Sequence, residues 1–282
     1  MPPIADSEAV FDRERMLAQH HAAVTLLQGI LSNPIATNVR WLDLACGRGQ
    51  IIAHLQDNLS QEERAKLHFV GYDIDNDNSR HAQKIAHSLG LAKCEFRIGE
   101  LAGFSRDERT NGPWDFITLT NTVHEINPAS LAKILVAGIE RLGDTGCLFV
   151  YDMDRLSTPE LGAVLWTGPE ATVILATMCN ALGCTGYKPP VGTWPHRSCN
   201  GWNAQIQRAH MQLPTDWKNQ LETAVDATAR CIEDVLKRKL TEVRKALEGL
   251  TLFGPETEEE AGDKEKLLYD FWAISRALEV QQ

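Results

Sequence analysis

The feature that most constrains this chain is an apolar strand that ends in a Gly-Xaa-Gly loop. Val39 to Leu44 is mostly apolar, and Gly47 and Gly49 follow it, where the absence of a Cβ lets backbone amides approach a ligand. Residues 51–55 then carry apolar side chains at helical spacing. A strand, a glycine loop and a helix predict the first βα unit of a doubly wound α/β fold.

A second apolar strand, Leu67 to Tyr72, ends in Asp73. A carboxylate at that position can accept hydrogen bonds from both hydroxyls of a ribose, and Asp43, beside the glycine loop, can hold an ammonium group directly or through water. The third glycine that a dinucleotide site needs is missing, because residues 50–52 are Gln-Ile-Ile. The two carboxylates therefore predict a ligand with a ribose at one end and an amino acid at the other.

Leu42 to Gly49 resembles the first motif of class I S-adenosylmethionine-dependent methyltransferases, and Asp73 matches the position of that family's ribose-binding acid. Residues 96–101, 114–121 and 146–152 resemble the third, fourth and fifth strands of the same family, so the resemblance covers roughly residues 38–153. It implies a doubly wound, mostly parallel, seven-stranded Rossmann-like methyltransferase sheet with helical additions at both ends.

The resemblance also implies that S-adenosylmethionine is the cofactor and S-adenosylhomocysteine its product. The residues that it places around the cofactor follow the first four strands: Asp43, Ala45, Gly47, Gly49, Asp73, Ile74, Gly99, Glu100, Leu101 and Asn121. In the alternative interpretation the aspartates are strand-end caps and the glycines ordinary turn residues. Five elements in the right order at suitable spacing favour the cofactor site.

His124 and Glu125 follow the fourth strand, where related small-molecule methyltransferases face the methyl group. Methyl transfer from a sulfonium is an in-line displacement, so the protein has to align a nucleophile, exclude water and sometimes remove a proton. A His-Glu pair suits the deprotonation of a hydroxyl, and we expect both residues to be catalytic. The alternative is a structural role, in which His124 caps the next helix or packs over the adenine.

The segment after the fourth strand lacks the Asn/Asp-Pro-Pro-aromatic tetrapeptide that amino-methylating enzymes of DNA, of glutamine side chains and of some RNA share. Its sequence is Asn121-Thr122-Val123-His124 instead. That class of methyltransferase is therefore disfavoured.

The chain divides by sequence into an N-terminal helical cap (1–37), a methyltransferase core (38–212) with a substrate loop or insertion around 155–200, and a C-terminal helical extension (213–282). Within the core, residues 159–182 predict a helix broken near Gly168, and residues 202–208 alternate like a late strand.

Residues 183–195 are rich in glycine and proline and predict an irregular loop. Aromatic and polar side chains on such a loop suit a substrate pocket, although a surface connection whose aromatics pack on the domain explains them equally well. We expect the substrate to contact side chains of this loop and of the residues just after it, namely Tyr187, Trp194, Arg197 and Trp202.

Residues 215–250 and 264–282 carry helical patterns, with a polar, acidic linker at 254–263 between them. Such helices either cover the active site or pair two protomers into a homodimer.

The formal net charge of −10 argues against a nucleic-acid substrate, because phosphate binding needs a basic surface. The sequence has no apolar run of 18 residues and no signal-like segment at its N-terminus, so we expect a soluble, cytoplasmic protein without a membrane span.

The seven cysteines are an odd number, which argues against a disulfide framework. Cys179, Cys184, His196 and Cys199 have an imperfect spacing for structural zinc, and we assign no metal ligand from the sequence.

Together these features predict an S-adenosylmethionine-dependent methyltransferase that acts on an oxygen or nitrogen of a small or medium-sized molecule. Oxygen is preferred because His124 offers a base. Two alternatives stay open: methylation of a protein or RNA partner recruited by the helical additions, and a non-catalytic relative that binds the cofactor and serves as a scaffold. The identity of the acceptor does not follow from the sequence.

Overall fold

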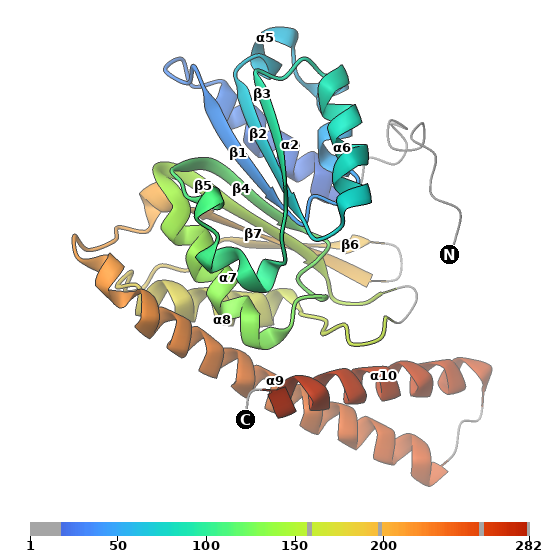
Figure 1. Cartoon of the computed structure of the whole chain (residues 1–282). Helices are drawn as coiled ribbons and strands as arrows, with labels where there is room; N and C mark the ends of the chain where they lie inside the picture. The colour runs from blue at the N-terminus through green and yellow to red at the C-terminus, as the bar shows by residue number, and fades with distance from the viewer. Residues whose placement is uncertain (1–17, 157–159, 197–198, 254–256, 281–282) are drawn as a thin grey trace. The chain divides into compact units, whose positions relative to one another are not determined.

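The computed structural model describes residues 18–156, 160–196, 199–253 and 257–280 (Figure 1). Its sheet has seven strands in the order β3-β2-β1-β4-β5-β7-β6. Strands β1 to β5 run parallel, and β6 and β7 pair in the antiparallel direction. The strands are β1 (Val39–Leu44), β2 (Leu67–Asp73), β3 (Lys93–Ile98), β4 (Trp114–Thr120), β5 (Leu142–Met153), β6 (Val191–His196) and β7 (Cys199–Gln207). The predicted fold class is confirmed.

Helices alternate with the parallel strands, and longer helices follow in the C-terminal part. They are α2 (Ala18–Leu31), α3 (Gln50–Ala53), α4 (Leu55–Asn58), α5 (Gln61–Arg64), α6 (Asn76–Ser88), α7 (Pro128–Arg141), α8 (Gly168–Ala181), α9 (Leu221–Phe253) and α10 (Glu258–Val280). Ser60 and Glu63 form a capping box at the start of α5, because each accepts a hydrogen bond from the backbone of the other.

The structure corrects three sequence predictions. The helix expected from residue 159 begins at Gly168, because Thr167 and Glu170 form a capping box that fixes its start there. The loop expected at 183–195 ends in a strand, since β6 finds its backbone partners on β7. The linker expected at 254–263 becomes helical from Glu258, where Thr257 caps α10.

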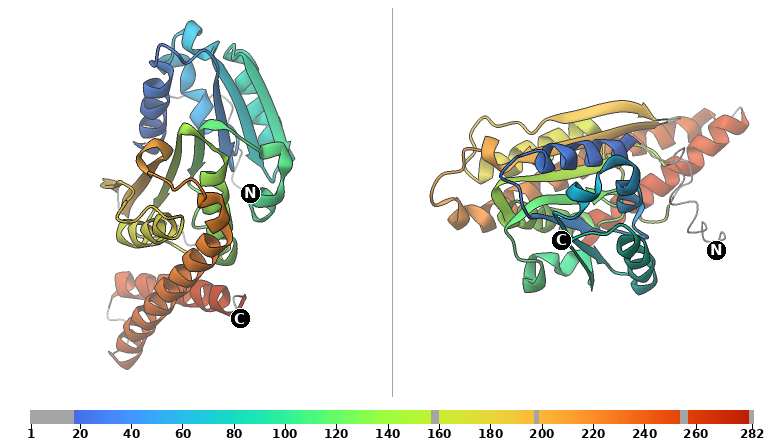
Figure 2. Two further views of the ribbon diagram at one scale, coloured as in Figure 1. Left: turned by 90° about the vertical axis from the view of Figure 1, so that its left-hand side faces the viewer. Right: turned by 90° about the horizontal axis from the view of Figure 1, so that it is seen from above.

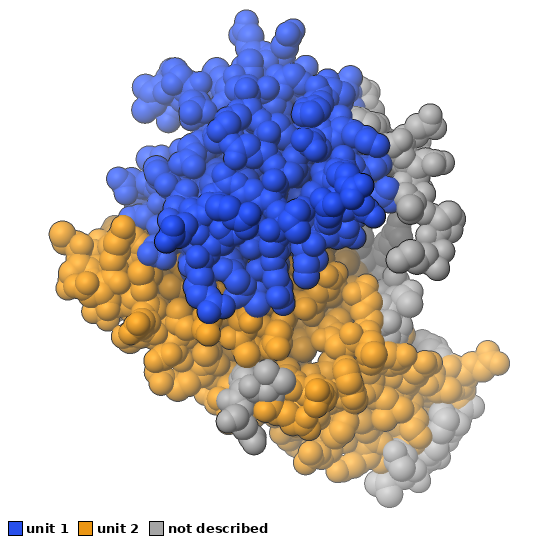
Figure 3. Space-filling model, in the orientation of Figure 1, with its two compact units in different colours: residues 1–120, 137–151, 205–210 blue, residues 121–136, 152–204, 211–282 orange. Residues whose placement is uncertain are grey.

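The described residues form two compact units, which Figure 3 colours separately. Unit 1 comprises residues up to 120 together with residues 137–151 and 205–210, and unit 2 comprises residues 121–136, 152–204 and those from 211 on. The division of the chain at residues 37 and 212 stays a prediction.

In the core of unit 1, aromatic side chains from neighbouring parallel strands pack against one another. Trp41 packs edge-on against Phe69, with ring centroids 4.9 Å apart, and lies 5.8 Å from the Phe116 ring. The indole N–H of Trp41 donates to Thr118 Oγ1 at 2.8 Å. Since β1 pairs in parallel with both β2 and β4, the carboxyl ends of the three strands meet at one edge of the sheet.

Three long helices dominate unit 2, where α9 packs against both α8 and α10 (Figure 2). Lys239 of α9 donates from Nζ to both carboxylate oxygens of Glu170 at 3.0 and 2.9 Å, which ties α9 to the first turn of α8. In the part of the chain that the structure describes, no helix combines the length and the apolar character that crossing a membrane requires. Pairing of protomers through the terminal helices stays a prediction.

We expect Gly99→Ala to destabilise unit 1, because a Cβ at this position would lie 2.2 Å from the hydroxyl oxygen of Tyr72. The Tyr72 ring is buried and cannot swing aside freely, so the free energy of unfolding should fall by about 1–3 kcal/mol. Gly103→Ala is the matched control, since a Cβ there meets nothing within 4 Å. Urea unfolding of both variants measures the difference, and equal stabilities would contradict the packing argument.

Candidate active site

The loop after β1 adopts the left-handed backbone conformation that glycine favours. Gly47 has φ 52° and Gly49 has φ 83°. A Cβ on Gly49 would lie 3.0 Å from Cα and Cβ of Ala82, so this glycine lets the loop pack closely against α6. A Cβ on Gly47 would meet nothing within 4 Å, so the backbone at Gly47 borders open space. The predicted loop is thus shaped to bring backbone amides to a ligand.

Asp73 ties this loop to the end of β2. Its Oδ2 accepts from the backbone N–H of Gly47 and its Oδ1 from that of Asp75, both at 2.8 Å. The side chain is buried, and a carboxylate has about four acceptor directions, so the two bonds leave capacity for ligand hydroxyls. The neighbouring Ile74 is 68% exposed.

Asp43 has a different environment, because it is buried inside β1 and accepts a 2.5 Å hydrogen bond from the Thr118 hydroxyl. Burial raises the pKa of Asp43 to about 7, against the opposing effect of that hydrogen bond. A cation placed beside Asp43 would therefore be favoured, since it would stabilise the buried carboxylate. Sequence reasoning missed Thr118, two residues before the end of β4, as its partner.

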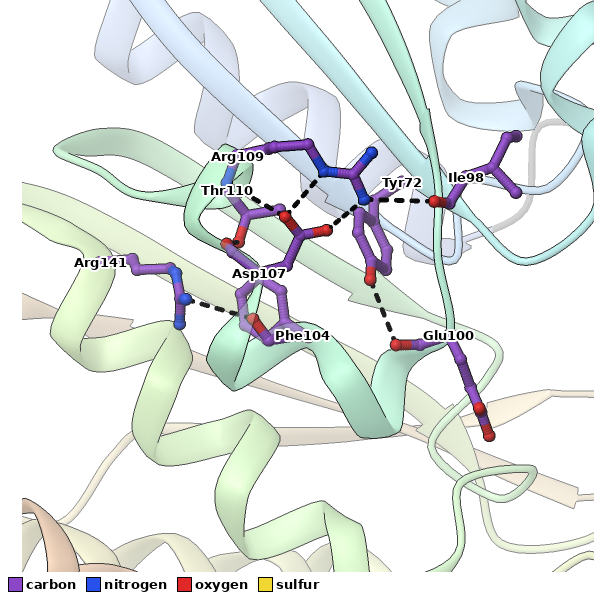
Figure 4. A network of polar contacts seen from close by, with 8 residues as sticks. All are labelled: Tyr72, Ile98, Glu100, Phe104, Asp107, Arg109, Thr110 and Arg141. Carbon is purple, nitrogen blue, oxygen red and sulfur yellow. Dashed lines mark hydrogen bonds and ion pairs between the residues drawn. The ribbon is translucent and has the colours of Figure 1, made fainter.

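The segment after β3 is held by a network of polar contacts (Figure 4). The hydroxyl of Tyr72 donates to the carbonyl of Glu100 at 3.2 Å, and Arg109 bonds both carboxylate oxygens of Asp107. Arg141 donates to the carbonyl of Phe104 at 3.1 Å. The carboxylate of Glu100 points away from this network in Figure 4. The segment 99–101, predicted to lie beside the cofactor, is thus held through a hydrogen bond to its backbone, and the Glu100 side chain points away from the network.

In unit 2, His124 lies on the turn after β4 and is buried, with 3% of its surface exposed. Asp152, fully buried at the end of β5, accepts from the backbone N–H of His124 at 2.7 Å and contacts its Nδ1 at 2.8 Å. The Asp152 carboxylate therefore fixes both the turn and the ring, with Nδ1 bearing the proton of that contact. The predicted partner Glu125 lies on the same turn. The backbone N–H of Glu125 donates to the carbonyl of Thr122 at 2.9 Å.

The other ring nitrogen of His124 faces two carboxylates. Nε2 lies 3.5 Å from Oε2 of Glu160 and 3.8 Å from Oε1 of Glu125. Burial acts to lower the pKa of His124, but the hydrogen bond and charge of Asp152, with the two glutamates, outweigh it and raise the pKa. Both glutamates are about half exposed, whereas the His124 side chain that they face is buried.

Sequence reasoning found His124 and Glu125 but missed Asp152 and Glu160. A carboxylate that ends the apolar strand β5 was a usable signal for Asp152, because β4 and β5 pair in parallel and Thr120 is opposite Tyr151. Nothing in the sequence pointed to Glu160. A backbone hydrogen bond from Val164 to the carbonyl of His124, 2.8 Å long, brings the Glu160 segment to this place.

A cavity of about 380 Å³ in unit 2 borders both glutamates. Its walls include Glu125, Glu160, Val164, Trp272 and Arg276. The Trp272 side chain is 44% exposed, so an aromatic surface of α10 is available to a ligand here.

The predicted substrate residues that the structure describes differ in burial. Trp202 is buried, and its indole N–H donates to the carbonyl of Trp166 at 2.7 Å, which gives it a packing role. Tyr187 and Trp194 are half-buried. Arg197 lies outside the described residues. Contact of these four with a substrate stays a prediction.

The predicted cofactor residue Asn121 belongs to unit 2 and has a left-handed φ of 56°. Cys179 and Cys184 are buried, and burial raises the pKa of the Cys179 thiol to about 12. Among the side chains that the structure describes, these cysteines and Cys199 belong to no group of three with metal-ligand spacing; the His196 side chain lies outside that set.

Residues 35–163 match the family described as "Methyltransferase domain". None of the curated proteins compared with the chain matches it. Among solved structures, the chain is similar to the CurJ carbon methyltransferase (14% identity, TM-score 0.49), with 67% of this chain and 54% of that one covered. It is also similar to magnesium protoporphyrin IX methyltransferase (ChlM) from Synechocystis PCC 6803 (13% identity, TM-score 0.48), with 67% and 83% covered. A third similar structure is a SAM dependent methyltransferase from Aquifex aeolicus (17% identity, TM-score 0.45), with 72% and 100% covered.

Because the pKa of Asp43 is raised in the folded state, the native protein holds a proton that the unfolded chain has already released between about pH 4 and 7. Stability should therefore fall as the pH rises through this window and level off above it. We expect the free energy of unfolding to drop by about 2–3 kcal/mol more in the natural protein than in Asp43→Asn between pH 5 and 8. Urea unfolding at both pH values tests this, and parallel pH profiles would contradict a buried, proton-holding Asp43.

Proposed function

We propose that this chain, which belongs through residues 35–163 to the class I S-adenosylmethionine-dependent methyltransferases, transfers a methyl group to an oxygen or nitrogen of a small or medium-sized molecule. The observation that carries the proposal is the arrangement around the buried His124. Asp152 holds one of its ring nitrogens, and the other nitrogen faces two glutamates that border a cavity.

The residues at the carboxyl edge of unit 1 fit S-adenosylmethionine. This cofactor has an ammonium group and a sulfonium, which suit the buried Asp43, and a ribose, which suits Asp73. When bound, the cofactor supplies an electrophilic methyl group. The residues of unit 1 that would hold it are those of the sequence prediction: Asp43, Ala45, Gly47, Gly49, Asp73, Ile74, Gly99, Glu100 and Leu101. Asn121 stays a prediction.

His124 and Glu125 are the residues that we propose for activation of the acceptor, with His124 as the base that removes its proton. Asp152 holds Nδ1, so Nε2 is the ring nitrogen available to an acceptor. A tightly held imidazole loses little entropy when it meets the reacting group.

The volume of the cavity and the net charge of the chain support a small acceptor. The cavity of about 380 Å³ in unit 2 lies in the range that small-molecule sites occupy. The net charge of −10 disfavours RNA, which a basic surface would attract. Tyr187, Trp194, Arg197 and Trp202 remain our proposal for substrate contacts.

Production of S-adenosylhomocysteine in mixtures of the protein, S-adenosylmethionine and defined acceptors tests the proposal. The acceptor panel should contain small molecules with hydroxyl or amino groups, peptides and RNA, with an Asp73→Ala protein as the blank. Turnover with a small hydroxyl or amino compound supports the proposal. Turnover restricted to peptides or RNA would replace it by the partner-methylation alternative, and binding without any turnover by the scaffold alternative.

We expect Asp73→Ala to weaken binding of S-adenosylhomocysteine at least about tenfold, because the substitution removes a charged acceptor and frees the Gly47 loop. The matched control is Asp75→Ala, an exposed carboxylate two residues away that caps α6. Calorimetric titration of both folded variants gives the affinities. Equal losses in the two would show that the effect comes from the shape of the turn and not from the ribose site.

For a substrate found in the panel, we expect His124→Asn to lower kcat by about 10²- to 10⁴-fold with little change in cofactor affinity. Asparagine keeps a donor that can reach Asp152, so the turn should stay folded. The control is His87→Ala, which changes an exposed histidine on α6. Unchanged turnover of His124→Asn at saturating cofactor would remove His124 from the chemistry.

A further inference from the structure

The His124 group concentrates negative charge around one imidazole. Asp152, Glu125 and Glu160 each place a carboxylate oxygen near a ring nitrogen of His124, at 2.8, 3.8 and 3.5 Å. Asp152 and His124 are buried, so the charge of Asp152 is only weakly screened by solvent, whereas Glu125 and Glu160 are about half exposed. Three carboxylates around one imidazole create a local negative potential that attracts cations.

The contact between Asp152 and Nδ1 is the one that orients metal-binding histidines. A ligating histidine nearly always donates its second ring N–H to a carboxylate, a carbonyl or water, which fixes the ring and leaves the other nitrogen for the metal. In this chain Asp152 holds Nδ1 at 2.8 Å and the backbone N–H of His124 at 2.7 Å. Nε2 thereby faces Glu125 and Glu160.

The spacing around Nε2 fits shared ligation better than hydrogen bonding. The distances from Nε2 to the two glutamates, 3.5 and 3.8 Å, exceed the 2.7–3.2 Å typical of N–H···O bonds. Two donor atoms that each lie about 2.1 Å from one cation are separated by about 3.0–3.4 Å. One ligand atom from each of His124, Glu125 and Glu160 lies within 4.8 Å of the others, so small side-chain rotations suffice to close the set.

Backbone hydrogen bonds hold the three ligands in place. The turn of His124 and Glu125 is closed by the bond from Glu125 N–H to the Thr122 carbonyl. The hydrogen bond from the Val164 N–H to the His124 carbonyl holds the segment 160–164 against the His124 turn. Within that segment, the Ala163 N–H donates to the carbonyl of Glu160 at 3.2 Å. The three donors come from two segments that are joined to each other, which is the preorganisation a metal site needs.

We propose that His124 Nε2, Glu125 and Glu160 bind a divalent first-row transition cation such as Mn²⁺. One imidazole and two carboxylates suit such an ion, whereas Mg²⁺ prefers oxygen ligands alone. Three protein ligands leave coordination positions open, as in catalytic metal sites.

The open positions give the site a chemical use. Glu125 and Glu160 border the cavity of about 380 Å³, so an oxygen-bearing small molecule in that cavity can complete the coordination. A coordinated hydroxyl has a lowered pKa, so a bound cation would take over the acceptor activation that we assign to Nε2, which it occupies. This use rests on the proposed function, but the binding of the cation itself does not.

Titration of chelator-treated protein with Mn²⁺ tests the proposal without cofactor or acceptor. Mn²⁺ is the better probe because the seven cysteines of the chain would capture thiol-seeking ions such as Zn²⁺. Loss of the electron paramagnetic resonance signal of free Mn²⁺ counts the bound ions. We expect one tight site per chain, and enhanced water-proton relaxation from the bound ion, since open positions exchange water.

The variants Glu125→Gln and Glu160→Gln should each weaken Mn²⁺ binding at least about tenfold. The matched control Glu265→Gln changes an exposed glutamate of α10 and should leave the affinity unchanged. Circular dichroism confirms that each variant is folded. Absence of a tight Mn²⁺ site in the natural protein would overturn the proposal, and so would binding that survives both substitutions. Neither result would bear on cofactor binding, which the Asp73→Ala titration measures separately.

Discussion

Asp73 joins the ends of three neighbouring segments at the carboxyl edge of unit 1. Its side chain accepts from Gly47, in the loop after β1, and from Asp75, in the turn before α6. Its backbone carbonyl accepts from Gly99, after β3, at 3.0 Å. The parallel register of β1, β2 and β3 brings the carboxyl ends of these three strands together, and the hydrogen bonds of Asp73 hold the segments that follow them in place. Every cofactor residue that we assign in unit 1 lies on or beside these segments.

The two acidic side chains at this edge, Asp43 and Asp73, lie in different electrostatic environments. Backbone N–H groups satisfy the carboxylate of Asp73, whereas Asp43 is buried with a single hydroxyl and its pKa is raised. A buried acid of this kind costs stability, and proteins retain such costs where a ligand relieves them. The difference gives the edge a direction: the cationic end of a ligand belongs near Asp43 and its hydroxyls near Asp73.

Local pattern explains what the sequence could predict. The apolar run of β1 and the two glycines after it depend on neighbours within a few residues, and both are found in the structure. Strand β6 was missed because its glycine and proline content favours a loop, while its pairing with β7 depends on a partner strand. Glu160 was missed for the same reason, because a backbone bond from Val164 to His124 brings its segment to the site.

The geometry of His124 bears on both of the roles that the sequence left open. From the sequence, a structural and a catalytic role were alternatives, but an imidazole has two nitrogens and the structure uses them differently. Asp152 occupies Nδ1 and the backbone N–H, which is the structural role, and Nε2 is turned toward the two glutamates. The first role makes the second more effective, because a ring that cannot rotate keeps its remaining nitrogen aimed at one point. A histidine fixed in this way is therefore better suited to chemistry than a free one.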